Sequence, residues 1–507
     1  MRCATPGRMI QITSVSKSSE GGRNGSPSAV PLVDSTNEDV FELRFAALET
    51  ARAWSPRVLS RLETAIRRGS DRSLFRINPL TFGRNLGIAE PEAIDLFVHA
   101  SAAGLFEMDW LLLCPMCACV AESFSSLTSV EDKYYCPMCR CDYESTLDDF
   151  IAVTFTVSRA VRPIAFHSMK NMSATDYCFE CRMTADGLRP DSLPLVDAFK
   201  GFSHGANYLS PNTVTLYEAA SEQGYYFGFD VDSRAYFEYP IEGPPASEPQ
   251  IVRILYTEDA CELSARTVAP GKITFEVENI AKKTGLLTIC SIPPGGERTR
   301  LQFVPFLTGG RLLVTQSFRE LFRAELIRSA EGIGVRDVTV IFTNLQGSTA
   351  LYERIGDLKA LSLVQQHFER LLHATIVNNG AVIKTIGDAV MAAFEKPTDA
   401  VRAAIAMWEE TERFNEFRQK KDIVLKVGIH RGPSIAVTFN ERLDYFGRTV
   451  NIAARIQNHA DGNEICMSEN VRCAPGVDAL LASRIVTKEQ IVLKGIDQMV
   501  TVFRVSL

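Results

Sequence analysis

The 507-residue sequence lacks a long apolar segment. No stretch approaches the ~18 consecutive apolar residues that a membrane-spanning helix requires. The longest candidate, 110–120, is short and contains three cysteines. Residues 1–31 are rich in serine and glycine and have no apolar core, so a secretory signal peptide is not predicted. We therefore expect a cytoplasmic protein without a membrane partner.

The sequence also lacks a strong bias in charge. Its net charge is −7, with 54 basic and 61 acidic residues, which gives no reason to expect nucleic acid as a partner. Its composition is that of an ordinary globular protein, and its length corresponds to about three domains.

Thirteen cysteines occur without an export signal, and six of them form close pairs. This usage favours reduced thiols over disulfides.

Two regions of different character come first. Residues 1–36 are dominated by serine, glycine and proline, and predict a disordered tail. Residues 37–112 predict a small helical region, in which one short helix starts at Pro79 and stops at Gly87. Two short helices across a glycine turn are typical of a winged helix, and nearby arginines leave DNA binding open. We favour a helical packing or docking unit.

A four-cysteine motif follows, in which two identical Cys-Pro-Met-Cys sequences lie eighteen residues apart. This spacing is that of a zinc ribbon, and four thiolates suit tetrahedral Zn²⁺. Residues 113–150 therefore predict a zinc-ribbon-like module. Because four protein ligands leave no open coordination position, we expect a structural site. The predicted zinc ligands are Cys114, Cys117, Cys136 and Cys139.

Other cysteines surround this motif and leave alternatives open. Cys119 and Cys141 follow the two pairs and are spare or alternative ligands. Cys178 and Cys181 form a third pair, for which a redox or second metal role stays open. Unliganded buried thiols and a redox sensor are the alternatives for the whole cluster.

Residues 151–313 predict a β-rich domain of unknown role, because short β-branched and aromatic runs alternate with Gly, Pro and Asn clusters. No phosphate loop or catalytic constellation occurs there, so no ligand is predicted. Strands are expected at 150–157, 213–217, 225–231, 251–256, 273–277, 286–292 and 311–314.

Residues 314–335 predict a connector helix. Ser317 and Glu320 fit a capping box, and an apolar stripe follows the helical period. The stripe packs either against a second copy of the helix or against its own chain, and the pattern does not choose between them. Its members are Phe318, Leu321, Phe322 and Leu326.

Residues 336–507 show an alternating α/β pattern. A strand at 338–343 runs into a turn, and a helix then starts at Gly347, Ser348 and Thr349, where free N–H groups suit phosphate oxygens. A β-hairpin is expected at 382–394, with Gly387 and Asp388 at its tip. Helices are expected through 361–372, 401–408 and 450–456, and strands at 423–429 and 435–439.

Three stretches in this region, 338–349, 382–394 and 444–455, occur in an order that resembles the catalytic domain of class III adenylate and guanylate cyclases. The resemblance covers the last third of the chain and implies a ferredoxin-like sheet with helices on one face. The predicted fold is thus multidomain α+β, with a class III cyclase domain at 336–507. The N-terminal layout resembles an extension of some bacterial soluble cyclases.

The resemblance implies a two-metal site. In this family two divalent ions, Mg²⁺ or Mn²⁺, are held by two carboxylates, activate the ribose 3′-oxygen and neutralise the triphosphate. The matching positions are Asp388 and Asn344, with Leu345 beside the latter. Asn344 carries no charge, and losing a positioned electrostatic group costs on the order of 10²–10³ in rate.

The resemblance also implies the other half of the site. Asn451 would orient the ribose, Arg455 would stabilise charge on the α-phosphate, and Lys494 would hold the terminal phosphates. Lys384 and Asp444 match the purine-reading pair, whose donor and acceptor suit adenine, so the expected substrate is ATP. Because both halves occur in one chain and face each other across subunits in the family, a homodimer with two sites follows.

Two hypotheses about function follow. The first is an adenylate cyclase in intracellular signalling, weakened by Asn344 and favouring Mn²⁺. The second is a non-enzymatic nucleotide-binding or regulatory dimerisation module. A DNA-binding regulator acting through residues 78–104 is a third hypothesis, which the net charge does not favour.

Overall fold

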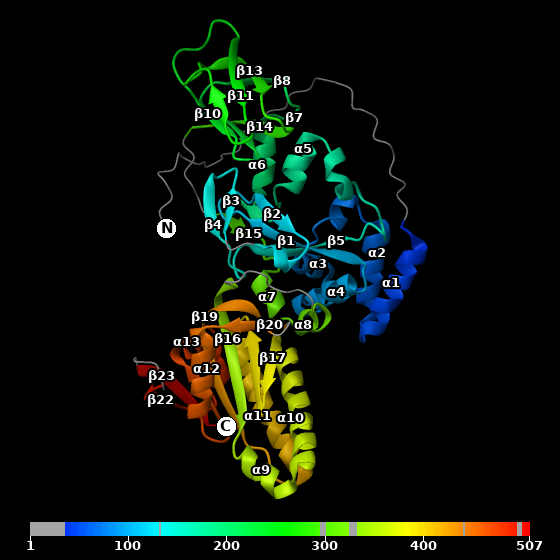
Figure 1. Ribbon diagram of the computed structural model, residues 1–507, viewed down its shortest axis with the longest axis vertical. Helices are drawn as coiled ribbons and strands as arrows, with labels where there is room; N and C mark the ends of the chain where they lie inside the picture. Colours follow the sequence, from blue (N-terminus) through cyan, green and yellow to red (C-terminus); the bar gives the residue numbers. More distant parts are fainter. Residues whose placement is uncertain are drawn as a thin grey trace.

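The structure is a computed structural model that describes residues 36–130, 133–294, 301–323, 332–439, 442–493 and 499–506. The predicted tail lies outside the described residues, apart from its last position. Along the long axis, a β-rich unit lies at one end, N-terminal helices and a small sheet lie in the middle, and a larger sheet lies at the other end (Figure 1). None of the described helices is long and apolar enough to cross a membrane.

The N-terminal helices pack on a three-stranded sheet. In α3 the Asn78 side chain accepts a hydrogen bond from the Leu80 N–H at 3.0 Å, and Gly87 ends the helix at φ 64°, as its missing Cβ allows. The helices bury aromatic side chains against the sheet, with Phe97 in contact with Phe155. The helices are α1 (Glu38–Ala51), α2 (Pro56–Arg68), η1 (Asp71–Leu74), α3 (Pro79–Leu86) and α4 (Glu90–Ala102).

The three-stranded sheet under these helices contains strands from regions that the sequence predicts as separate domains. Its strand order is β2–β1–β5, from β1 (Phe106–Leu113), β2 (Val120–Phe124) and β5 (Ile151–Val157). β1 runs across the expected boundary at 112/113. Because β5 pairs with β1 over seven positions, the helical region and the start of the β-rich region share one sheet.

The β-rich unit consists of two four-stranded sheets, β10–β9–β14–β7 and β12–β11–β13–β8. Their facing sides bury large aromatic residues such as Tyr217, Tyr226, Phe237 and Phe275, the arrangement of a β-sandwich. Five of the seven expected strands lie here at the expected places. The strands are β7 (Ser203–Leu209), β8 (Val214–Ser221), β9 (Gly224–Asp230), β10 (Tyr236–Ile241), β11 (Gln250–Tyr256), β12 (Cys261–Leu263), β13 (Gly271–Asn279) and β14 (Gly285–Ile292).

The strand expected at 311–314 is wrong, because this segment belongs to helix α7 (Gly309–Leu313). The Thr308 hydroxyl accepts a hydrogen bond from the Arg311 N–H at 3.1 Å and caps the helix. A Cβ at Gly310 would lie 2.2 Å from a carboxylate oxygen of Asp148. The glycine therefore permits a close approach that the apolar pattern does not reveal.

Short elements link the two sheets to the middle of the molecule. They are η2 (Leu127–Ser129), β3 (Lys133–Cys136), β4 (Cys141–Glu144), η3 (Ala165–Asn171), α5 (Ala174–Asp176), η4 (Tyr177–Cys181), β6 (Gly187–Leu188), α6 (Leu195–Phe202) and β15 (Gln302–Phe303). β3 pairs with β4, and β6 pairs with β15.

The connector contains helix α8 (Gln316–Leu321). The expected capping box is wrong, because the helix starts after Thr315 and Ser317 lies inside it, where its hydroxyl donates to an Asp95 carboxylate oxygen at 2.6 Å. Phe318 is fully buried and its ring lies 6.2 Å from that of Trp110. Phe318 and Phe322 thus pack on their own chain, whereas Leu321 is exposed. Leu326 lies outside the described residues.

The C-terminal sheet has the strand order β17–β18–β16–β19–β21–β23–β22, with β20 paired to β19. The two short strands expected at 423–429 and 435–439 form one long strand, β19. The strands are β16 (Ile333–Leu345), β17 (Gly380–Ile386), β18 (Ala389–Phe394), β19 (Leu425–Phe439), β20 (Arg442–Phe446), β21 (Glu464–Ser468), β22 (Ile485–Val492) and β23 (Met499–Ser506). The helices are α9 (Ser348–Ile355), α10 (Asp357–Val377), α11 (Pro397–Arg418), α12 (Arg448–His459), α13 (Glu469–Arg472) and α14 (Val477–Leu481).

Helices cover both faces of this sheet, which corrects the expectation of one covered face. Side chains alternate along a strand, and Val427 and Ile429 of β19 join the apolar cluster of α10 and α11. Between them, a Cβ at Gly428 would lie 2.2 Å from the backbone nitrogen of Gln457 in α12. α12 therefore packs on the opposite face, where the missing side chain at Gly428 lets the helix come close.

The N-terminal part and the C-terminal sheet share one buried apolar cluster, to which Trp110, Phe318, Val338 and Tyr445 all contribute. Polar contacts join them as well, since the Leu147 N–H donates to the Gly334 carbonyl at 3.0 Å. The two parts are therefore packed together and are not joined by a free linker.

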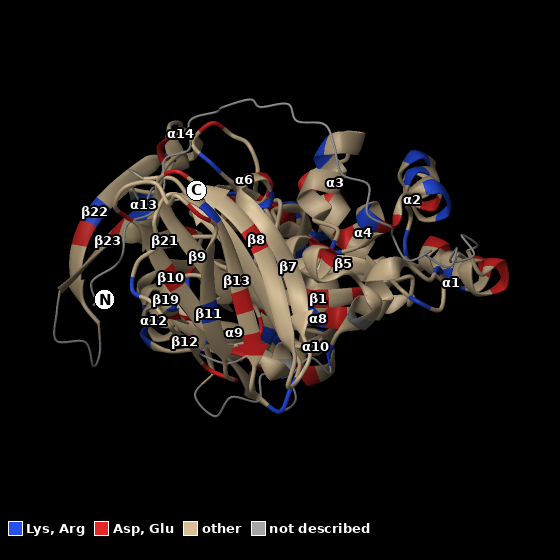
Figure 2. Cartoon of the chain, turned by 90° about the horizontal axis from the view of Figure 1, so that it is seen from above, with Lys and Arg blue, Asp and Glu red and all other residues tan. Residues whose placement is uncertain are grey.

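Basic and acidic residues are interspersed over most of the elements visible in Figure 2, in keeping with the small net charge.

Candidate active site and metal centre

The end of β16 and the tip of the β17–β18 hairpin form the first part of the site. Thr343 lies opposite Val390 in an antiparallel pair, so the register brings Asp388 beside the end of β16. Gly387, at φ 61°, makes the hairpin turn. The Asp388 Oδ2 atom is buried and has no hydrogen-bond partner among the described residues. An orphaned carboxylate oxygen of this kind fits a bound cation.

Asn344 lies at the end of β16 and is half-buried. Its neighbours Leu345 and Ile341 point into the cluster of α10 and α11. By strand alternation the Asn344 side chain lies on the other face, which α12 covers. The Leu345 side chain is buried, so only its main-chain carbonyl is suited to contact an ion.

The turn after β16 forms an anion-binding geometry. Gly347 has φ 71° and precedes α9, and no described side chain caps the first N–H groups of that helix. The Gln346 N–H donates to the Val424 carbonyl at 2.9 Å, which holds the turn to the segment before β19. The N–H groups around Ser348 and Thr349 are therefore suited to phosphate oxygens. Lys494, the expected terminal-phosphate ligand, lies outside the described residues.

Lys384 and Asp444 meet, as the resemblance implies. The Lys384 Nζ lies 2.5 Å from the Asp444 Oδ2. The other carboxylate oxygen of Asp444 accepts the Tyr445 N–H at 2.8 Å. The Asp444 side chain is only 12% exposed, whereas that of Lys384 is 37% exposed. A cationic donor and an anionic acceptor thus lie side by side, and the lysine is partly open to solvent.

α12 carries Asn451 and Arg455 one turn apart, so they share one face of the helix. Asn451 is exposed and Arg455 half-buried. No hydrogen bond or ion pair joins either side chain to another described residue. Within one chain, the structure thus joins Lys384 to Asp444 and places Asp388 beside the end of β16, and no described hydrogen bond or ion pair links Asn451 or Arg455 to either group.

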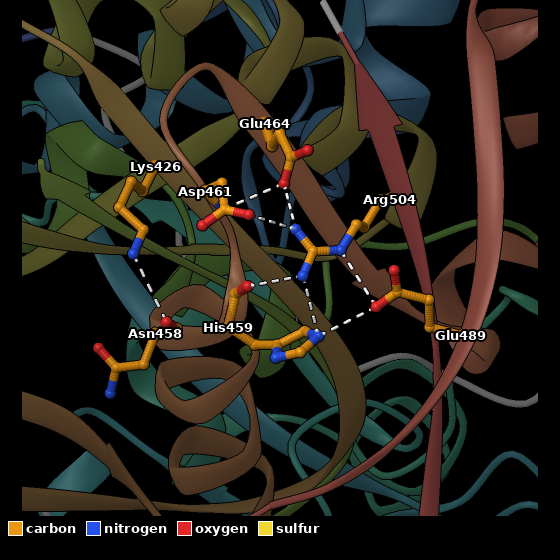
Figure 3. A network of polar contacts seen from close by, with 7 residues as sticks. All are labelled: Lys426, Asn458, His459, Asp461, Glu464, Glu489 and Arg504. Carbon is orange, nitrogen blue, oxygen red and sulfur yellow. Dashed lines mark hydrogen bonds and ion pairs between the residues drawn. The ribbon is translucent and has the colours of Figure 1, made fainter.

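A polar network fixes the far end of α12 (Figure 3). Arg504 of β23 donates to Glu464, and to Glu489 at 3.1 Å and the His459 carbonyl at 3.1 Å. Burial lowers the pKa of Arg504, but its hydrogen bonds to Glu489 and Glu464 outweigh this and raise the pKa overall. Sequence reasoning missed this network because its members come from α12, β21, β22 and β23, and no short-range pattern links them.

The four predicted zinc ligands gather in a second location. Their sulfur atoms all lie within 4.8 Å of one another and all four residues are buried. The sulfurs of Cys114 and Cys139 are 3.6 Å apart, as are those of Cys117 and Cys136. The Cys139 N–H points at the Cys136 sulfur at 3.4 Å, a contact that stabilises a thiolate. This donor set fits a tetrahedral soft metal.

The third cysteine pair does not form such a site. The Cys178 sulfur accepts the Thr288 hydroxyl at 3.3 Å, whereas that of Cys181 lies 3.7 Å from the Met172 sulfur. Burial raises the pKa of Cys178 to about 12 and that of Cys181 to about 11. Both thiols are protonated near neutral pH, which favours a packing role over redox or metal chemistry.

Comparisons with known proteins match two segments. Residues 40–320 match the family of unknown function DUF5939, and residues 333–505 match the adenylate and guanylate cyclase catalytic domain. An adenylate cyclase of Anabaena cylindrica is 28% identical over 186 residues, covering 34% of this chain and 37% of that protein. Adenylate cyclase 1 of Rhizobium meliloti is 27% identical over 136 residues, covering 24% of this chain and 20% of that protein. The chain thus spans well under half of these relatives' lengths.

Two solved structures are similar over the same segment. The adenylyl cyclase CyaB from P. aeruginosa is 22% identical, with a TM-score of 0.30 and coverage of 34% of this chain and 94% of that one. The guanylyl cyclase Cya2 is 19% identical, with a TM-score of 0.31 and coverage of 34% and 93%. Because its model matches residues 40–320, more than half of the sequence, the chain belongs to the DUF5939 family, and residues 333–505 match the adenylate and guanylate cyclase catalytic domain.

Proposed function

We propose that the chain is an adenylate cyclase that converts ATP to 3′,5′-cyclic AMP and pyrophosphate in intracellular signalling. The observation that carries this proposal is the Lys384–Asp444 pair. In adenine, N1 accepts a hydrogen bond and the N6 amine donates one, which matches a lysine donor beside a carboxylate acceptor. Guanine presents the opposite pattern at these positions. The pair therefore favours ATP over GTP as substrate.

Asp388, Asn344 and the Leu345 carbonyl are the groups that would hold Mg²⁺ or Mn²⁺. When bound, such ions lower the pKa of the ribose 3′-hydroxyl and neutralise the triphosphate. Asp388 contributes a full charge through an oxygen that has no described partner. Asn344 contributes only a neutral amide oxygen, which is the reason to expect slow turnover. The N–H groups at the start of α9 would bind phosphate oxygens.

Asn451 and Arg455 would complete the site of a second copy in a homodimer. Arg455 would stabilise the charge on the α-phosphate, and Asn451 would orient the ribose so that its 3′-oxygen faces the phosphorus. Both side chains lie on one face of α12 without described partners. In the proposed dimer, this face of α12 would lie over Asp388 and the purine pair of the other subunit. Such a dimer would have two equivalent sites, each with metal-binding and purine-binding residues from one subunit and Asn451 and Arg455 from the other.

We also propose that Cys114, Cys117, Cys136 and Cys139 bind one structural Zn²⁺. Their sulfurs are mutually within 4.8 Å, and four thiolates fill the tetrahedral positions. The cysteines belong to the same apolar cluster as Phe227 and Phe229 of the β-sandwich. The ion would therefore stabilise the N-terminal part rather than act in catalysis.

The test is cyclic AMP production by the purified protein with ATP and Mg²⁺ or Mn²⁺, beside Asp388→Ala. Product from the wild type, lost on Asp388→Ala, is the expected result. Glu416→Ala is the matched control, because it removes an exposed carboxylate on α11 and should leave the rate unchanged. ATP binding without product would instead favour the alternative, a nucleotide-binding regulatory module.

A further inference from the structure

The two members of the purine pair come from strands that are not hydrogen-bonded neighbours. Lys384 lies on β17, at one edge of the sheet, and Asp444 on β20, which pairs only with β19. β17 also contains an irregularity, because its register shifts between Val382 and Lys384. The sheet ladder alone therefore does not determine the separation of the two side chains, and another element must do so.

α8 of the connector contacts β17 at this irregularity. The Val382 N–H donates to the Gln316 side-chain oxygen at 2.9 Å. The Gln316 amide nitrogen in turn donates to Glu320 at 2.7 Å, which holds the side chain in this orientation. The Gln316 side chain, which lies outside the sheet, thus accepts a hydrogen bond from the backbone N–H of Val382, two residues before Lys384.

α8 contacts β20 in the same way. The Arg319 guanidinium donates to the Leu443 carbonyl, directly before Asp444, and to the Leu313 carbonyl at 3.2 Å. Burial lowers the pKa of Arg319, whereas the nearby Tyr445 and Asp444 raise it. A charge held in such surroundings is costly unless its hydrogen bonds are kept. Gln316 and Arg319 line one small cavity together with Val382 and Leu443.

The opposite side of α8 is attached to the N-terminal helices. The Ser317 hydroxyl donates to an Asp95 carboxylate oxygen of α4 at 2.6 Å. Phe318 is fully buried against Trp110 of β1. α8 therefore contacts the N-terminal part on one side and the two strands that carry the purine pair on the other.

We propose that Gln316 and Arg319 are positioning residues that set the separation of Lys384 and Asp444, so that the N-terminal part determines purine selection in the cyclase domain. Neither residue belongs to the purine pair, and each contacts the backbone of a strand that carries one member of the pair. The inference rests on the proposed function, because it assigns base reading to Lys384 and Asp444. It goes beyond that function by placing the control of base selection outside the cyclase domain.

The first test measures ATP and GTP binding by calorimetry on the full chain. Arg319→Met should weaken ATP binding about tenfold, the size expected for one lost charge-assisted hydrogen bond, and GTP binding much less. Arg319→Lys should restore most of the preference, because it keeps a charged donor. Arg311→Met is the matched control, since Arg311 pairs with Glu90 and Glu395 at the same junction and makes no described side-chain hydrogen bond or ion pair to β17 or β20. Equal ATP:GTP ratios in Arg319→Met and Arg311→Met would overturn the inference.

The second test separates this inference from the proposed function. Hydrogen exchange without nucleotide should be about tenfold faster over 442–446 in Arg319→Met and over 380–386 in Gln316→Met, with both segments unchanged in Arg311→Met. Unchanged exchange in the first two variants would overturn the positioning role. A wild type that binds neither nucleotide would instead refute the proposed function, and the exchange rates would still decide whether α8 holds the strands.

Discussion

Asn344 and Asp388 lie at the ends of neighbouring strands and differ by one charge. The Asp388 Oδ2 is buried without a described partner, so its carboxylate is available to a cation. An amide at position 344 presents one oxygen of similar shape, and its nitrogen repels a cation. If the proposed function holds, this one atom sets the charge that residue 344 presents to a metal ion.

Asn344→Asp should raise cyclic AMP production on the order of 10²-fold, because it returns a charged ligand to a site that is otherwise built. Initial rates with Mg²⁺ and with Mn²⁺ measure it, and the gain should be larger with Mg²⁺. The control is Asn458→Asp, an exposed position on α12. A rate that stays equal to the wild type would show that position 344 is not a metal ligand.

His367 is a second residue whose own chemistry has a measurable effect, in this case on the stability of the fold. It is fully buried in α10, and neither ring nitrogen has a hydrogen-bond partner among the described residues. Burial lowers its pKa from 6.5 to about 4. The folded protein therefore binds this proton less readily than the unfolded chain does, so stability is lost as pH falls from 6.5 towards about 4.

His367→Leu should remove part of this acid sensitivity. The difference in unfolding free energy between about pH 7 and pH 5, measured in urea, should shrink by about 2 kcal/mol, since each pH unit over which only the unfolded chain binds the proton costs about 1.4 kcal/mol. His373→Leu changes an exposed histidine of the same helix and should leave the difference unchanged. An identical pH dependence of His367→Leu and wild type would contradict the assignment.

At the scale of elements, short segments hold functional groups by contacts remote in sequence. Arg504 fixes the end of α12 to three strands (Figure 3), and so orients the helix that carries Asn451 and Arg455.

The β3–β4 hairpin has two short strands, and a hairpin of this size is not stable alone. Its cysteines pack under the β-sandwich, so a metal there would hold the hairpin, β1 and the sandwich together.

Cys136→Ser should abolish binding of one Zn²⁺ per chain and lower the melting temperature by about 5 °C or more, because metal binding and folding of such a hairpin are coupled. Elemental analysis and thermal unfolding measure the two effects. Cys473→Ser removes an exposed thiol and should change neither. A metal-free wild type, or unchanged metal content in Cys136→Ser, would argue for unliganded thiols.

At the scale of the whole molecule, the proposed active site would be divided between two copies, and the N-terminal part is continuous with the C-terminal sheet. One buried cluster runs from Trp110 through Phe318 to Tyr445. Packed side chains thus lead from the N-terminal part to β20, which carries Asp444. The positioning role proposed for α8 depends on this continuity.

Mixing inactive variants tests the divided site. Asp388→Ala and Arg455→Ala should each be inactive alone, but an equal mixture, after subunit exchange, should recover about a quarter of the wild-type rate, because half the dimers are mixed and each mixed dimer has one intact site. The cyclic AMP assay measures it. Mixing Asp388→Ala with Asn344→Ala, which damage the same half, provides the control and should recover nothing.

Much of the C-terminal domain was predictable because its signals are local. The Gly387–Asp388 turn, the glycine before α9 and the Lys384–Asp444 pair are all placed by short motifs whose order resembles a known family. The Cys-Pro-Met-Cys pairs likewise predicted a cluster that the structure brings within 4.8 Å. The strand predicted at 311–314 was wrong because Thr308 caps a helix there and Gly310 allows a close approach to Asp148, which is distant in the chain.

The sequence by itself supplied the groups that the proposed chemistry uses: the carboxylate of Asp388, the neutral amide of Asn344, the donor and acceptor of the Lys384–Asp444 pair and the four cysteine thiols. These depend on residue type and short spacing. Only the tertiary structure decided that α8 packs on its own chain, that Gln316 and Arg319 reach the purine strands, and that α12 covers the second face of the sheet. Such contacts join residues tens to hundreds of positions apart, and no local period or motif records them.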